Sequence, residues 1–321
     1  MPKISIIIPI YNVEKFIGQC AHSLFKQTLD DLEYIFINDC TLDNSIDILY
    51  DILEDYPHRK AQVKILHNKF NLGQSKTRQR GVMAATGDYV IHCDSDDWVE
   101  PNWLSCLYAE AIEKDADLVW CDFTKIYEDK SVKYFNNTAL TSKEDALLKL
   151  ITGPRWGSLC INLVKREIAK NKYIRWPSWN YCEDLALVFQ YTVLAKRVSY
   201  INRSLYWYRN NSQSICNTQD KNKVLANING AINAIMIELE YSKLVNLYSR
   251  FKPYCLTEIF KVKGRVFLIA ENSREACRLW RQTEDHLGFF DIWKSNMLMI
   301  DKVKISLIYL SVYPILKKLC K

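Results

Sequence analysis

The first hundred residues alternate between short continuous apolar runs and segments in which apolar residues recur every three or four positions. Such runs are typical of strands buried on both faces, and such segments are typical of amphipathic helices. The predicted strands are Ile4 to Pro9, Leu32 to Asn38, Val63 to His67 and Tyr89 to Cys93, with helices between them over about 13–24, 46–53 and 75–85. This alternation predicts an α/β fold with a doubly wound, mainly parallel sheet.

Polar side chains follow the predicted strands at their carboxyl ends, where open α/β sheets bind ligands. Tyr11 and Asn12 follow the first strand, Asp39 follows the second, and the run Asp94-Ser95-Asp96-Asp97 follows the fourth. Three carboxylates at one point suit a divalent cation that carries a phosphorylated ligand. The same run is also typical of a solvated turn or a helix cap, so its pattern alone leaves both interpretations open.

The glycine patterns that cradle phosphates are missing from the sequence. No G-x-G-x-x-G follows the first strand and no Walker A loop is present, which disfavours dinucleotide oxidoreductases and P-loop enzymes. A sugar-nucleotide nucleotidyltransferase would be expected to carry a glycine-rich basic loop after the first strand. This chain instead has Ile10-Tyr11-Asn12-Val13-Glu14.

Composition adds limits on the setting of the protein. Of 321 residues, 49% are hydrophobic and 25% charged, and the formal charge of +6 comes without a recognisable nucleic-acid module, so we expect no nucleic-acid partner. The 11 cysteines are odd in number and include no Cys-x-x-Cys pair, which indicates a reduced, cytoplasmic protein. The first strand begins at Ile4, and no export signal is visible before it.

Four short motifs, taken together in their order and spacing, resemble glycosyltransferase family 2. They are the run from Ile4 to Asn12, the run from Ile37 to Ser45, Asn71-Leu72-Gly73 and Asp94-Ser95-Asp96-Asp97. The resemblance covers about residues 1–215 and implies a GT-A fold, a nucleotide-sugar donor and transfer with inversion at the anomeric carbon. We therefore expect a GT-A domain over residues 1–215 and a helical region with a basic apolar tail over residues 216–321.

The resemblance also implies roles in donor binding. Asp39 matches a carboxylate that accepts a hydrogen bond from the imide nitrogen of uracil, which favours a UDP-linked donor, although an Asx turn is the alternative. Arg78 either neutralises donor phosphate or is an ordinary solvated helix arginine. Asp43 is expected to cap the helix after it. The substrate-binding assignments are Pro9, Tyr11, Asn12, Asp39, Arg78, Asp94, Glu183 and Arg209.

In the acidic run, the resemblance assigns Asp96 to direct coordination of Mn²⁺ or Mg²⁺ and Asp94 to the ribose or the metal shell. The ion would stabilise the charge that develops on the leaving nucleoside diphosphate. Asp97 either caps the helix after Pro101 or orients the metal ligands.

A second acidic pair and a late arginine complete the predicted site. Glu183-Asp184 resembles the family's Glu-Asp at a helix start, so Asp184 is the expected base for the acceptor hydroxyl; favourable charge in a helix first turn is the alternative. Arg209 matches a segment that folds over the diphosphate, with a surface cation as the alternative. Trp156 is a candidate for the acceptor pocket.

The tail from Asp301 to Lys321 combines apolar residues with five lysines. Its apolar stretch is too short to span a bilayer, and Pro314 interrupts it. The favoured interpretation is a segment that lies in an anionic membrane surface, which suits a lipid-linked acceptor. The alternative is a helix packed on its own domain or on a homodimer partner.

The sequence therefore predicts a metal-dependent inverting glycosyltransferase that transfers a sugar from a nucleotide sugar to a glycan or lipid-linked acceptor. Family habit suggests cell-surface polysaccharides such as capsule or lipopolysaccharide. The expected location is the cytoplasm, at the inner face of the cytoplasmic membrane if the tail binds lipid. A noncatalytic nucleotide-sugar-binding or scaffold protein on the same fold is the other class, and the retained Asp96 and Asp184 disfavour it.

Overall fold

The computed structural model describes residues 1–127, 129, 131–135, 142–153, 157–210, 218, 220–283 and 287–309. The chain divides into two compact units. The first comprises Met1–Ala146, Trp156–Asn180 and Leu187–Ser212, and the second comprises Leu147–Arg155, Tyr181–Ala186 and Gln213–Lys321. The division into a GT-A domain over residues 1–215 and a helical C-terminal region over residues 216–321 stays a prediction.

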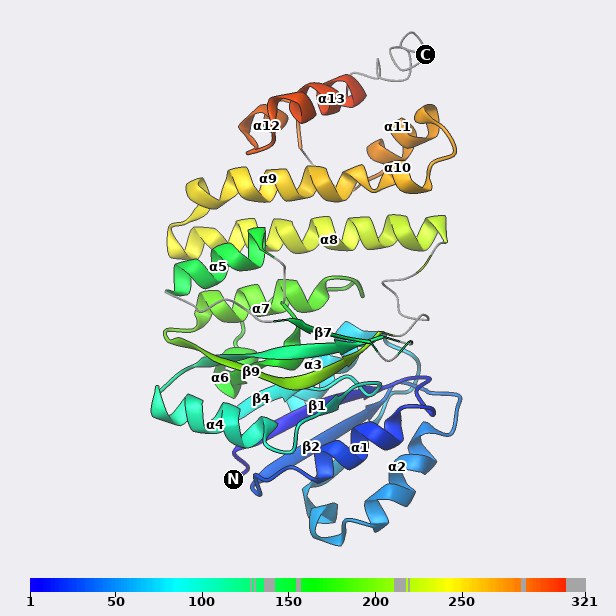
Figure 1. Cartoon of the computed structure of the whole chain (residues 1–321), viewed down its shortest axis with the longest axis vertical. Coiled ribbons are helices and arrows are strands. Elements are labelled where there is room, and N and C mark those ends of the chain that lie inside the picture. The colour runs from blue at the N-terminus through cyan, green and yellow to red at the C-terminus, as the bar shows by residue number, and fades with distance from the viewer. Residues whose placement is uncertain are drawn as a thin grey trace. The chain divides into compact units, whose positions relative to one another are not determined.

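Strands and helices alternate through the first hundred residues as predicted (Figure 1). The strands are β1 (Ile4–Ile10), β2 (Leu32–Asn38), β3 (Val63–His67), β4 (Tyr89–His92), β5 (Trp98–Val99), β6 (Leu118–Ile126), β7 (Val132–Phe135), β8 (Asn162–Lys165) and β9 (Val198–Arg209). The helices up to β9 are α1 (Ile17–Phe25), α2 (Ser45–Glu54), α3 (Gln74–Ala84), α4 (Trp103–Glu113), α5 (Lys143–Thr152), α6 (Arg166–Ala169) and α7 (Glu183–Leu194), with short 3₁₀ helices η1 (Pro57–Gln62) and η2 (Leu159–Ile161).

The strands form one sheet in the order β3-β2-β1-β4-β8-β6-β9-β5, and β7 pairs with β6. The first four strands in this order are parallel, as expected when helices connect them. β8 then runs antiparallel to both β4 and β6, while β9 runs parallel to β6. The predicted α/β class is confirmed, and the antiparallel pairs are a feature that the periodicity of the sequence did not reveal.

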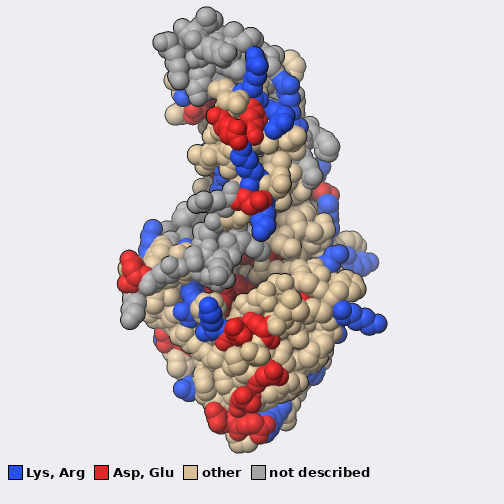
Figure 2. Space-filling model, turned by 90° about the vertical axis from the view of Figure 1, so that its right-hand side faces the viewer, with Lys and Arg blue, Asp and Glu red and all other residues tan. Residues whose placement is uncertain are grey.

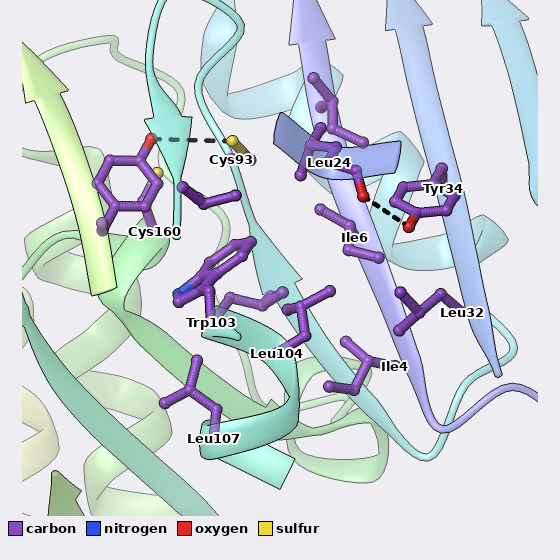
Figure 3. Close-up of a cluster of buried hydrophobic side chains, with 14 of the residues drawn as sticks. Ile4, Ile6, Leu24, Leu32, Tyr34, Cys93, Trp103, Leu104, Leu107 and Cys160 are labelled. Atoms are coloured by element: carbon purple, nitrogen blue, oxygen red, sulfur yellow. Dashed lines mark hydrogen bonds between the residues drawn. The ribbon is translucent and has the colours of Figure 1, made fainter. Parts of the chain in front are cut away.

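The main core lies between the sheet and the helices α1 and α4 (Figure 3). Ile4 and Ile6 from β1 lie near Leu24 of α1 and Trp103 of α4, and all four side chains are fully buried. On the opposite face of β1, α3 packs very closely. A Cβ added at Gly81 would lie 2.5 Å from Cγ2 of Ile7, so the close approach of this helix requires a glycine.

The C-terminal part of the second unit is helical, as predicted. Its helices are α8 (Lys221–Tyr241), α9 (Tyr248–Gly264), α10 (Val266–Ile269), α11 (Ser273–Arg281), α12 (Phe289–Lys294) and α13 (Met299–Tyr309), with the 3₁₀ helix η4 (Ser242–Val245) after α8. Among the described helices, none combines the length and the apolarity needed to cross a bilayer.

Candidate active site

The acidic run forms the turn that leads from β4 to β5, and α3 supplies it with a cation. A guanidinium nitrogen of Arg78 donates to Oδ1 of Asp94 at 2.6 Å, and Arg78 is only 2% exposed. Gln74, one turn earlier on α3, lies 3.5 Å from the same oxygen. Arg78 is therefore not a solvated helix arginine, because its charge is buried against the acidic turn.

Asp97 is the most deeply buried carboxylate of the turn, with 1% of its surface exposed. The hydroxyl of Tyr206 and the backbone N–H of Arg209, both on β9, donate to its two oxygens at 2.7 Å each. The predicted alternative of a helix cap is wrong, because α4 begins at Trp103 and its N-cap residue is Asn102. Asp97 instead ties the acidic turn to β9.

The carboxylates of this turn repel one another. Burial raises the pKa of Asp97 well above its ordinary value, and the neighbouring charges of Asp96 and Asp94 raise it further. The hydrogen bonds from β9 oppose this shift without cancelling it. A cation placed beside Asp96 would relieve the repulsion, which is the electrostatic condition expected of a metal-binding turn.

Arg209 is built into the wall of the same turn. Its Nε donates to the backbone carbonyl of Asp96 at 2.9 Å, and an Nη donates to Oε1 of Gln19 at 2.6 Å. The guanidinium lies over the rings of Phe16 and Trp98, with its central carbon 4.9 and 4.8 Å from the ring centroids. Arg209 is therefore not an unengaged surface cation, since several elements fix its charge beside the carboxylates.

Asp39, directly after β2, organises the loop that leads into α3. Its carboxylate accepts from the backbone N–H groups of Leu72 at 2.8 Å and Gly73 at 3.0 Å, and from Nδ2 of Asn68 at 2.6 Å. Gly73 has a φ of +79°, a conformation that favours glycine. Base reading by Asp39 stays a prediction, and three of the acceptor positions of this carboxylate are used by the protein itself.

The loops after β1 and β2 are joined to each other. Asn12, with a φ of 53°, donates its backbone N–H to Oγ1 of Thr41 at 2.8 Å. Tyr11 beside it is 45% exposed, and Pro9 pairs with Ile37 inside the sheet. Tyr11 and Asn12 therefore lie at the carboxyl edge of the sheet, where their sequence positions placed them, and their contact with a donor stays a prediction.

Asp43 strengthens this junction and supports the start of α2. Its carboxylate accepts from the backbone N–H groups of Ser45 at 3.2 Å and Glu14 at 2.8 Å, although the N-cap residue itself is Asn44. Burial opposes ionisation of Asp43, but the hydrogen bonds outweigh it and lower the pKa of this carboxyl. Asp43 thus stabilises the junction between the two loops and the first turn of α2, while Asn44 occupies the N-cap position itself.

The predicted base lies at the beginning of α7. This helix starts at Glu183, which is 4% exposed, and Oδ1 of Asp184 accepts the backbone N–H of Leu185 at 2.9 Å. Both acids lie in the first turn, as predicted. They belong to the second unit, so their roles in substrate binding and proton transfer stay predictions. Trp156 lies outside the described residues.

Among the described residues, no group of three or more His, Cys, Asp and Glu side chains is assembled around a common metal position. A hard cation such as Mg²⁺ needs only one or two carboxylates when phosphate oxygens and water complete its shell. Asp96 and Asp94 supply such a donor set, although Oδ1 of Asp94 is shared with Arg78. The residues present therefore fit a metal that arrives with a diphosphate.

The model of the family named Glycosyl transferase family 2 matches residues 5–190 of the chain. The chain belongs to glycosyltransferase family 2. This family-2 chain is 29% identical over 227 residues to glycosyltransferase GlyG of Streptococcus pneumoniae, covering 67% of itself and 73% of GlyG. It is 34% identical over 222 residues to an uncharacterized glycosyltransferase of Bacillus subtilis, EpsJ, covering 67% of itself and 63% of EpsJ. It thus spans somewhat less than two thirds of EpsJ.

Solved structures show the same fold at low identity. The Staphylococcus aureus TarS fragment 1–349 in complex with UDP-GlcNAc matches with a TM-score of 0.58 and 18% identity, covering 96% of this chain and 92% of TarS 1–349. The mannosyltransferase PcManGT from Pyrobaculum calidifontis, in complex with GDP-Man and Mn²⁺, matches with a TM-score of 0.56 and 11% identity, covering 99% and 87%. The predicted family and GT-A fold are confirmed.

Several residues around the acidic turn of this family-2 chain escaped sequence reasoning. Tyr206 holds Asp97, and Phe16, Gln19 and Trp98 hold Arg209. The signal for Tyr206 is its place in β9, where aromatic residues precede Arg209 at positions 206–208. No pattern in the sequence paired this strand with the turn, because their separation exceeds one hundred residues.

Proposed function

We propose that the protein is a metal-dependent inverting glycosyltransferase that uses a nucleotide sugar, with UDP as the favoured nucleotide, and a glycan or lipid-linked acceptor. The proposed setting is synthesis of cell-surface polysaccharide, such as capsule or lipopolysaccharide, on the cytoplasmic side of the membrane. UDP-GlcNAc and UDP are bound in structures of TarS, which supports a nucleotide-sugar donor.

The observation that carries this proposal is the acidic turn between β4 and β5. Three carboxylates lie within four residues at the carboxyl edge of the sheet, and two arginines from different elements, α3 and β9, donate to this turn. A turn that served only the fold would not need to hold like charges together at this cost in repulsion. A donor diphosphate with its cation supplies the missing compensation.

In the proposed mechanism, Asp96 and Asp94 would hold Mn²⁺ or Mg²⁺. The bound ion would neutralise the charge that develops on the leaving diphosphate. Arg78 orients Asp94 through their 2.6 Å contact, and Arg209 fixes the backbone at Asp96. The donor base would lie at the edge formed by Tyr11, Asn12 and Asp39.

We further propose that Asp184 removes the proton of the acceptor hydroxyl, with Glu183 contributing to substrate binding. Inversion requires attack from the face opposite the leaving diphosphate, so the base must be a carboxylate other than those of the acidic turn. Asp184 lies in the first turn of α7, where the helix N-terminus favours a negative charge.

Isothermal titration with a panel of nucleotide sugars, each with and without Mn²⁺, tests the donor class. The expected result is binding of one UDP-sugar that strengthens when Mn²⁺ is present. A protein that binds no nucleotide under any metal condition would not be the proposed enzyme. A protein that binds a donor but transfers it to no acceptor would support the noncatalytic class.

Two substitutions separate the proposed roles. Asp96→Asn is expected to remove the Mn²⁺-dependent part of donor binding together with transfer. Asp184→Asn is expected to leave donor affinity unchanged and to lower the transfer rate by at least about 100-fold, because only this residue is asked to move a proton. Asp47→Asn, at an exposed position on α2, is the matched control. Equal loss of donor affinity in Asp96→Asn and Asp184→Asn would refute the division.

A further inference from the structure

The second unit exposes a cluster of large apolar side chains on α12 and the beginning of α13, called here the α12–α13 surface. Its members are Phe290 (74% exposed), Trp293 (43%), Leu298 (72%), Met299 (65%), Ile300 (61%) and Val303 (44%). Single exposed apolar residues are normal on soluble proteins, whereas six within fourteen residues form a patch that marks an interaction site.

The opposite side of this segment is firmly attached to its own unit. Ile292 is fully buried, and the backbone N–H of Asn296 donates to Oγ1 of Thr257 on α9 at 2.8 Å. Lys302 donates to the backbone carbonyl of Trp293 at 3.2 Å, which joins α13 to α12. The exposed residues are thus presented by a docked element and do not belong to a frayed end.

The charges of the α12–α13 surface are basic on balance. Lys294, Lys302 and Lys304 lie within or beside it, against the acids Asp291 and Asp301, and Lys294 lies 3.7 Å from Asp291. In the upper part of the face that Figure 2 shows, Lys and Arg side chains lie among Asp and Glu side chains. Lysine is depleted at protein–protein interfaces, whereas lysines that flank apolar and aromatic residues are typical of elements lying on anionic membranes.

We propose that the α12–α13 surface binds the surface of an anionic lipid bilayer. Phe290, Trp293 and residues 298–300 would enter the boundary between headgroups and acyl chains, with the lysines among the headgroups. α13 has 11 residues and is therefore about 16 Å long, which suits a helix lying in the interface. The membrane contact predicted for the segment from Asp301 to Lys321 would therefore also include residues of α12 and the beginning of α13.

Vesicle co-sedimentation of the full chain tests this proposal without any donor or acceptor, so its outcome is separate from that of the proposed reaction. The vesicles are phosphatidylcholine alone and phosphatidylcholine with one quarter phosphatidylglycerol, at low and high salt. The expected result is binding to the anionic vesicles only, weakened by salt. No binding to anionic vesicles, or equal binding to both, would overturn the proposal.

Substitutions then locate the surface. Phe290→Ser with Trp293→Ser is expected to abolish vesicle binding. Lys294→Gln, Lys302→Gln and Lys304→Gln together are expected to weaken it by about 100-fold, at about fivefold for each lysine. Leu268→Ser, at a leucine that is 83% exposed on α10, is the matched control and should bind as the wild type does.

Two further outcomes would contradict the proposal. Unchanged vesicle binding by the lysine variant would show that these lysines do not interact with lipid charge. The lysine variant also keeps the test valid if the aromatic variant fails to fold. A wild-type dimer that the aromatic substitutions convert to a monomer in light scattering, without vesicle binding by either form, would assign the surface to a second copy of the chain.

Discussion

Two buried carboxylates at opposite ends of the same sheet have opposite electrostatic surroundings. Glu33, at the amino end of β2, accepts from the hydroxyl of Ser5, the ammonium group of Lys64 and both the N–H and the hydroxyl of Thr86. Asp97, at the carboxyl edge, has two donors from β9 and two carboxylates as neighbours. Burial raises the pKa of both, yet the hydrogen bonds outweigh it only at Glu33, whose pKa is lowered.

Under the proposed function, the difference separates a carboxylate that serves the fold from one whose surroundings leave negative charge for a ligand. At the amino end, the protein supplies enough donors to keep a buried charge stable, and nothing further is needed there. At the carboxyl edge, the compensation provided by the protein is incomplete. A site that binds a cation must keep part of its negative charge uncompensated until the cation arrives. The protein is then less stable without the cation and binds the cation more tightly.

Within this comparison of Glu33 and Asp97, the largest expected effect comes from Asp97→Asn. The amide keeps the shape and can still accept from the N–H of Arg209, but it removes one of three like charges. We expect transfer to fall by about 100-fold, with a thermal midpoint in metal-free buffer equal to or above that of the wild type. Activity assays and metal-free thermal melts check this. A lowered midpoint with normal activity would show that Asp97, like Glu33, stabilises the fold.

Glu33→Gln should show the opposite behaviour. It leaves the ammonium group of Lys64 without its partner, so the free energy of unfolding should fall by about 2 kcal/mol while transfer per folded molecule stays unchanged. Because the folded pKa is below the ordinary value of 4.5, the stabilisation is present above that pH and is lost as pH falls through the folded pKa. Urea titrations should therefore show variant and wild type converging in acid.

Arg209→Lys probes the brace of the acidic turn with the smallest expected effect. Lysine keeps the charge but loses the planar contact with Phe16 and Trp98 and the fork that reaches Asp96 and Gln19. Mn²⁺ affinity in the presence of donor should fall about tenfold, with little change in unfolding free energy. An unchanged metal affinity would mean that the contact of Arg209 with Phe16 and Trp98 contributes only to the fold.

The sequence allowed the parallel half of the sheet to be predicted because each of its strands is a buried apolar run followed by a polar residue. β2 was predicted at Leu32 to Asn38, its observed bounds. The motif positions also predicted which loops carry Asp39 and Asp94. Local patterns were enough for these features, since each depends on neighbours in sequence or on a repeated strand and helix unit.

The contacts that decide the behaviour of the site could not be predicted in the same way. Whether Asp97 caps a helix or binds β9 depends on Tyr206, which lies 109 positions later. Glu33 gave no sequence signal, because its donors come from three separate segments. The apolar residues of α12 have the spacing of a core helix, and only the structure shows that Phe290 is exposed.

The bonds from Asp97 to β9 also have a consequence for the order in which the protein is made. Residues 94–97 leave the ribosome more than a hundred residues before Arg209, whose N–H binds Asp97. The parallel strands β1 to β4 can pair while synthesis continues, but the acidic turn cannot take its final shape until β9 has emerged. Long-range closure of this kind is slow to form. A nascent chain would therefore pair its parallel strands first and, under the proposed function, complete its donor site only after β9 has emerged.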